Sequence, residues 1–182
     1  PEEKNHQLKH SLNYGAILGL SLIIFAVIKY VFDLMFTQYM GLIDYLIMII
    51  LIYMGLKSYR DGILNGTISY ARALGTGTLI SLVAAIIYAV FNYLLYSVID
   101  PELMEKGFIE YEEQLLQQNR MTPEQIEIIM EKARERANPI YSTLWTIPSY
   151  TFLGFIFTLI ISLFVKRTQS PFQETNHAEE QN

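Results

Sequence analysis

Four long apolar stretches divide the chain, and most of its charged residues lie between them or at their ends. The stretches cover residues 14–35, 42–56, 73–99 and 140–165. A bilayer core is crossed by about 20 helical residues, and the second stretch reaches that length if it extends over 39–59. A soluble bundle would repeat a polar face at helical period, and a barrel would alternate every second residue. The pattern instead predicts four transmembrane helices.

The segment between the third and fourth stretches has a different pattern, which predicts a helical hairpin outside the membrane. Asp100-Pro101 is typical of an N-cap followed by proline in the first turn, and the helix it starts should run to about Gln118. Thr122 and Gln125 form a capping-box signature for a second, amphipathic helix.

The apolar residues of this segment allow two interpretations. They either pack on each other or on the membrane surface, or they dock a partner protein. The candidate partner surface consists of Phe108, Leu115, Ile126, Ile129 and Met130.

These patterns together define an all-α membrane protein. Residues 1–13 form a cytoplasmic N-terminal flank, 14–99 the first three transmembrane helices, and 100–139 the external hairpin. The fourth transmembrane helix covers 140–167, and a disordered cytoplasmic tail covers 168–182, which is rich in Gln, Ser, Asn and Glu.

Composition sharpens this organisation. A net charge of −5 alone would indicate an acidic soluble domain, but apolar residues make up 52% of the chain and charged residues only 17%, against about a quarter in soluble domains. Residues 100–139 hold ten acids and five bases. All of the net charge therefore belongs to the predicted hairpin, and the rest of the chain is balanced.

The distribution of Lys and Arg predicts the orientation. Basic residues flank the N-terminus, follow the second stretch and follow the fourth, whereas the first loop at 36–41 has none. Because cytoplasmic loops are enriched in Lys and Arg, both termini should be cytoplasmic and the acidic hairpin should lie outside.

Several motifs occur in an order that resembles a known family. They are Lys9-His-Ser-Leu-Asn-Tyr-Gly15, Tyr59-Arg60-Asp61, Ile68-Ser-Tyr-Ala-Arg-Ala-Leu-Gly75-Thr-Gly77, and Tyr88 through Asp100-Pro101. Over about residues 8–167 the chain resembles the bacterial four-helix membrane proteins catalogued as domain of unknown function 4199. The resemblance implies a multi-pass protein of the bacterial inner membrane and supplies no catalytic residues.

Ionisable and polar residues near the outer ends of the stretches form a candidate site. Lys29 and Asp33 are four residues apart, so they predict a neutralising pair with Asp44 nearby. The alternative is a polar vestibule for an ion or solute, made of Lys29, Asp33, Asp44 and Asn92. For Asn92 we expect a hydrogen bond between helices.

Small residues recur at helical spacing and predict close helix packing. The candidate positions are Gly15, Gly19, Gly75, Gly77 and Ser81. Packing within the bundle is one interpretation and a homodimer seam is the other. Pro148 should kink the fourth helix.

The remaining chemistry is sparse. His6 and His10 have the spacing of helical metal ligands, but no third ligand accompanies them, and we expect no metal, no cofactor and no enzymatic activity. The few bases adjoin apolar stretches, which disfavours nucleic acid.

We therefore expect a non-enzymatic structural or interaction protein that presents the 100–139 hairpin to a protein partner. Membrane lipid and a homo-oligomer are further expected partners. A small oligomeric transporter or channel is the alternative.

Overall fold

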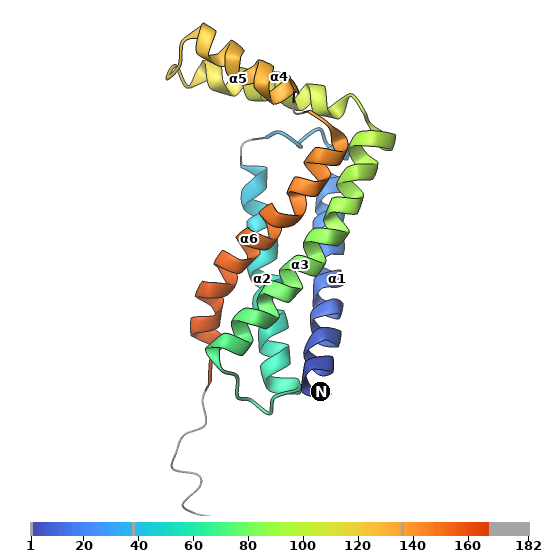
Figure 1. Ribbon diagram of the computed structural model, residues 1–182, viewed down its shortest axis with the longest axis vertical. Coiled ribbons are helices and arrows are strands. Elements are labelled where there is room, and N and C mark those ends of the chain that lie inside the picture. The colour runs from blue at the N-terminus through green and yellow to red at the C-terminus, as the bar shows by residue number, and fades with distance from the viewer. Residues whose placement is uncertain (1, 38, 136, 168–182) are drawn as a thin grey trace, which may run out of the picture.

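The described part of the chain is helical from end to end (Figure 1). The computed structural model describes residues 2–37, 39–135 and 137–167, and the tail predicted to be disordered lies outside them. In chain order the elements are α1 (Glu2–Val31), α2 (Met40–Gly62), α3 (Tyr70–Leu94), the π-helix η1 (Leu95–Ile99), α4 (Leu103–Gln117), α5 (Pro123–Glu135) and α6 (Pro139–Val165).

Four of these elements are long and apolar enough to cross a membrane: α1, α2, α3 with η1, and α6. This confirms the four predicted apolar helices. Their outer surfaces carry large apolar side chains, among them Ile24, Val90 and Phe164, which are 61%, 58% and 77% exposed. An apolar surface that surrounds a bundle in this way is suited to lipid rather than to water.

The long helices run side by side, and the polar elements lie at the two ends (Figure 1). The α1–α2 loop lies at one end, where α4 and α5 cross the bundle and project beyond it. The start of α1, the α2–α3 loop and the last turn of α6 lie at the other end.

The helix α1 is longer at its start and shorter at its end than the sequence pattern predicts. It begins at Glu2, so the polar flank continues the helix. In this flank Gln7 Nε2 donates to Thr76 Oγ1 at 3.0 Å, and His10 Nε2 lies 2.8 Å from the carbonyl oxygen of Gly55. Beyond Val31 the backbone of Asp33 has φ +56°, a left-handed conformation that ends a helix.

Small residues set the distance between α1 and α3. A Cβ placed on Gly15 would lie 2.5 Å from Val83 Cβ, and one on Gly19 would lie 3.0 Å from Ile87 Cβ. No side chain fits in that space, so the two backbones approach closely and gain packing contacts that lipid cannot replace.

Glycines also bring α3 and α6 close together, and each of the two helices contributes one. Gly77 faces Thr158, and Gly154 faces Ser81, in each case too closely for a Cβ on the glycine. Gly75 differs, because a Cβ there would meet its nearest neighbour at an ordinary 3.7 Å. Gly75 therefore faces the Gln7 side chain of α1 at ordinary contact distance and is not as closely packed as Gly77 and Gly154.

The start of α4 also differs from the prediction. Glu102, not Asp100, precedes α4, and its side chain makes no capping hydrogen bond. The Asp100 carboxylate instead accepts hydrogen bonds from Lys106 Nζ at 3.3 Å and from the Tyr30 hydroxyl at 3.4 Å. Asp100 thus connects the end of α1 to α4.

The predicted starts of the last two helices are confirmed. Thr122 Oγ1 accepts from the backbone N–H of Gln125 at 3.4 Å, and Gln125 Oε1 accepts from the N–H of Thr122 at 3.0 Å, which completes the capping box. Asn138 Oδ1 accepts from the N–H of Ile140 at 2.9 Å and caps α6. The helix continues through Pro148.

Candidate functional site

Helices α4 and α5, called here the α4–α5 pair, pack on each other through a small apolar core. Leu115, Ile126 and Met130 are buried between them, and Phe108 and Ile129 pack against these three. The five residues of the candidate partner surface therefore lie together inside the pair. The apolar stripes of the two helices thus face each other, and the docking of a partner stays a prediction.

An ion pair also joins the two helices. Arg134 on α5 lies 2.8 Å from Glu105 Oε1 and 4.0 Å from Glu112 Oε2, both on α4. Its guanidinium carbon is 5.8 Å from the centroid of the Phe108 ring. Exposed ion pairs contribute little to stability, so this contact mainly fixes the register of α4 against α5.

The α1–α2 loop holds the α4–α5 pair against the bundle. The ring of Phe36 fills the space beside Gly107, where a Cβ would lie 2.8 Å from Phe36 Cε1. Gln114 Nε2 donates to the carbonyl oxygen of Phe36 at 3.5 Å. The hydrogen bond from Lys106 to Asp100, followed by the charge of that carboxylate, raises the pKa of the Lys106 amino group.

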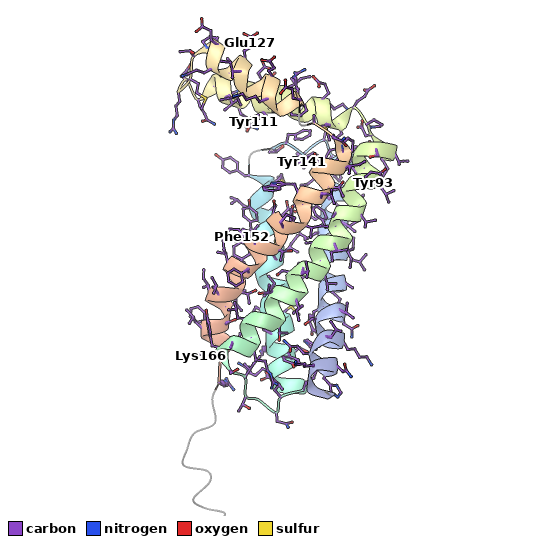
Figure 2. The ribbon with its side chains drawn as sticks, in the orientation of Figure 1. Tyr93, Tyr111, Glu127, Tyr141, Phe152 and Lys166 are labelled. Atoms are coloured by element: carbon purple, nitrogen blue, oxygen red, sulfur yellow. The ribbon has the colours of Figure 1, made fainter. Side chains whose placement is uncertain are left out.

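A groove of about 670 Å³ lies along the α4–α5 pair. Its apolar floor and its charged rim are lined by Glu112, Leu116, Pro123, Ile126, Glu127, Met130, Glu131 and Arg134. Glu127 points away from the bundle, whereas Tyr111 points toward it (Figure 2). We call this surface the acidic groove.

A second cavity, of about 450 Å³, separates α4 from the ends of α3 and α6. Its lining includes Asn92, Phe108 and Thr146. Asn92 Nδ2 donates to Thr146 Oγ1 at 3.4 Å, which confirms the expected hydrogen bond between helices. Asn92 therefore belongs to the α3–α6 contact beneath α4.

A buried ion pair lies between α1 and α2. Lys29 Nζ is 2.6 Å from Asp44 Oδ2, and each side chain is only 7% exposed. The Lys29 ammonium also lies 4.9 Å from the centroid of the Phe25 ring. The second carboxylate oxygen of Asp44, Oδ1, is buried and has no hydrogen-bond donor among the described residues.

Two tyrosines lie against each other between the other two long helices. The rings of Tyr88 on α3 and Tyr150 on α6 lie 5.0 Å apart between centroids, with Tyr88 buried and Tyr150 half-buried. Lys29, Asp44, Tyr88 and Tyr150 come one from each of the four long helices and are called here the polar cluster.

The predicted pairing of Lys29 with Asp33 is wrong. The helix ends at Val31, so Asp33 is not one helical turn from Lys29, and its side chain lines a surface pocket with Phe36 and Lys106. Asp44, expected only to lie nearby, is the partner of Lys29.

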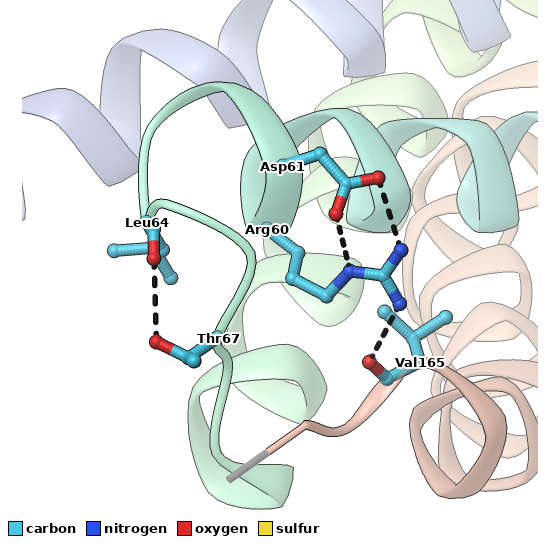
Figure 3. Close-up of polar contacts among 5 residues, drawn as sticks. All are labelled: Arg60, Asp61, Leu64, Thr67 and Val165. Atoms are coloured by element: carbon cyan, nitrogen blue, oxygen red, sulfur yellow. Dashed lines mark hydrogen bonds and ion pairs between the residues drawn. The ribbon is translucent and has the colours of Figure 1, made fainter. Parts of the chain in front are cut away.

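The opposite end of the bundle is joined by Arg60, whose side chain is 7% exposed. Its Nε and Nη2 donate to the two carboxylate oxygens of Asp61 at 2.6 and 3.0 Å, and Nη1 donates to the carbonyl oxygen of Val165 at 3.1 Å (Figure 3). The last carbonyls of a helix lack partners within the helix, so Arg60 completes the C-terminal turn of α6. Ile68 and Arg167 exchange backbone hydrogen bonds beside it.

Sequence reasoning noted Arg60 only as a topology signal and as part of a family motif. It named Tyr88 only within a family motif and did not single out Tyr150. A basic residue in the last turn of a helix was a usable signal for Arg60. The described residues contain no group of three or more His, Asp or Glu able to hold a metal ion.

The fold defines a class of all-helical proteins in which four helices are suited to a membrane and a polar helical pair covers one end. Residues 13–167 match the family described as "Protein of unknown function (DUF4199)", and the chain belongs to that family. No curated protein matched the chain. No solved structure matched it.

Proposed function

We propose that the protein is a membrane-anchored interaction protein without enzymatic activity. In this proposal its four long helices anchor it, and the α4–α5 pair forms an extramembrane hairpin that is presented to a partner protein. The observation that carries the proposal is the fixed attachment of this pair through Phe36, Gly107 and the Tyr30–Asp100–Lys106 contacts. A surface held in one orientation loses less entropy on binding than a mobile one.

The charge of the α4–α5 pair supports the same role. The whole net charge of the chain belongs to 100–139, and the side chains of Glu113, Glu127 and Glu131 are exposed there. Complementary charge speeds encounter and excludes wrong partners. We therefore expect the partner to carry a basic surface.

The proposal includes a location. The family resemblance supports the bacterial inner membrane, and the bases favour cytoplasmic termini. The end of α2, the start of α3 and the end of α6 lie at the end of the bundle opposite α4 and α5 (Figure 1). These segments carry the bases Lys57, Arg60, Arg72 and Lys166. The α4–α5 pair would then face the outer side, with lipid around the long helices.

Site-specific cross-linking in native cells tests this function. A photo-reactive residue replaces Glu113 on the exposed side of α4 and, as a matched control, Ile63 at the opposite end. We expect a discrete protein adduct from position 113 and a different pattern from position 63. Adducts from neither position, or the same adduct from both, would contradict a partner bound at α4–α5.

A small transporter is the second candidate, and the polar cluster favours it. The Asp44 Oδ1 atom is buried without a donor among the described residues, and such groups within apolar helices are unusual for a purely structural bundle. Reconstitution in liposomes separates the two candidates. Ion flux that depends on the protein and is lost in the double variant Lys29→Met with Asp44→Leu, which should keep the bundle folded, would support transport. Absence of flux from the unaltered protein would leave the interaction role as the proposal.

A further inference from the structure

The α4–α5 pair is too small to complete its own core. The two helices have 15 and 13 residues and bury only Leu115, Ile126 and Met130 fully between them. Helices shorter than about 12–15 residues are marginal without packing partners. Phe36 and the bundle end cover one side of the pair, while the acidic groove leaves the other side open.

The floor of the acidic groove is apolar. Leu116 is 48% exposed there, and Ile126 and Met130 form the bottom at 3% and 4% exposure. The exposed side of Leu116 and the Pro123 ring are surfaces that a third apolar helix face would cover.

Two carboxylates at the rim of the acidic groove have no cation paired with them in the described part of the chain. Glu127 and Glu131 are four residues apart on α5 and share one face, where like charges repel. Arg134, the cation in the lining, already contacts Glu105 and Glu112. Within 2–37, 39–135 and 137–167, neither Glu127 nor Glu131 has an ion-pair partner.

From these features we infer that the acidic groove binds a basic amphipathic helix of a partner protein; the inference rests on the proposed function. The apolar stripe of that helix lies on Leu116 and Pro123, and its Lys or Arg residues reach Glu127 and Glu131. Because α5 has 13 residues, about 20 Å of helix, the groove accommodates three to four turns of the partner. This is recognition of a helix in a groove.

The orientation of the groove argues against lipid as the occupant. Glu127 points away from the bundle (Figure 2), so the rim does not face the membrane that the long helices would occupy. Anionic headgroups attract basic surfaces and would be repelled by this one.

The test uses the full chain in nanodiscs of zwitterionic lipid. The probe is a fluorescent 14-residue peptide of Leu and Lys arranged as an amphipathic helix, and a scrambled peptide of the same composition is its control. Titrations followed by anisotropy, with empty nanodiscs subtracted, give the Kd of each peptide. The ordered peptide should bind more tightly than the scrambled one.

Two double variants remove the same charge from different places. We expect Glu127→Gln with Glu131→Gln to raise the Kd about tenfold, as the loss of two surface ion pairs allows. The matched control, Glu113→Gln with Glu135→Gln, removes two exposed carboxylates outside the groove lining and should change the Kd less than about twofold. Equal effects of both variants would show attraction to net charge alone and overturn the inference.

Methyl NMR adds a readout that does not depend on charge. The peptide should shift the methyl signal of Met130 in the groove floor. The methyl signal of Met54, which is 49% exposed on α2, should stay unchanged. Failure of the ordered peptide to bind, equal binding of the scrambled peptide, or an unchanged Met130 signal would each overturn the inference. If cross-linking from position 113 still captures a partner and is unaffected by the Glu127/Glu131 variant, the proposed function stands and only the groove is wrong.

Discussion

The pair of Lys29 and Asp44 shows what a single polar contact costs and contributes inside a lipid-facing bundle. Taking two charges out of water carries a penalty that their attraction offsets only at short distance. The 2.6 Å separation and the nearby Phe25 ring meet that condition for Lys29. Asp44 keeps one oxygen without a donor in the described residues, so the pair is not fully satisfied.

Removing one member of this pair should be strongly destabilising. We expect Asp44→Asn or Lys29→Met to lower the free energy of unfolding by about 3–5 kcal/mol, because a buried charge loses its partner. Unfolding in detergent micelles measures the change. The double variant Lys29→Met with Asp44→Leu should recover most of the loss, and Asp33→Asn should have little effect because Asp33 is exposed.

Sequence reasoning identified the three ionisable residues but paired them incorrectly. A spacing of four residues implies contact only while the helix continues. Phe32 and Asp33 are neither glycine nor proline, so the sequence does not predict the left-handed backbone that ends α1 there. The Lys29–Asp44 contact also depends on how α1 packs against α2, which local pattern does not encode.

At the scale of helices, small residues decide how closely α3 approaches its neighbours. Their spacing in the sequence indicated Gly15, Gly19 and Gly77 but not Gly154, and spacing does not say which neighbour a position faces. Gly77 meets Thr158 of α6, whereas Gly75 turns toward a wider gap. The capping signals of α5 and α6 were predictable because a cap is a local interaction, and the start of α4 was not, because Asp100 contacts Tyr30 on a distant helix.

These two glycines form a matched test of the α3–α6 contact. Gly77→Ala should destabilise the protein by about 1–3 kcal/mol, because the added methyl forces the helices apart. Gly75→Ala should be neutral or stabilising by up to about 1 kcal/mol, since alanine favours helix and meets nothing closer than 3.7 Å. Thermal unfolding of both variants in one detergent compares them; equal losses would show that the α3–α6 approach does not set stability.

At the scale of the molecule, the α1–α2 loop joins the four-helix bundle to the α4–α5 pair, which the hydropathy pattern separates. Hydropathy alone divides the chain into apolar stretches and a polar segment, and it contains no sign that Phe36 fills the space beside Gly107. The fold class was therefore predictable, and the orientation of the α4–α5 pair on the bundle was not.

Phe36→Ala should loosen that orientation without unfolding either unit. Spin labels at Gln117 on α4 and Val90 on α3 report the distance between them, and we expect its distribution to broaden clearly in the variant. Phe32→Ala is the control, because Phe32 is in the same loop and 68% exposed. An unchanged distribution in Phe36→Ala would mean that the chain connections alone orient the pair.

The place of α6 in the chain has a consequence for biogenesis. The face of α3 that carries Gly77 and Ser81 is completed by α6, which the ribosome delivers only after residues 100–138. At about 5–20 residues per second, roughly 2–8 s separate the two helices during synthesis. Throughout that interval the surface of α3 at Gly77 and Ser81 is not covered by α6. The Arg60 guanidinium also has no Val165 carbonyl to bind. The newly made three-helix intermediate thus lacks both contacts until α6 arrives.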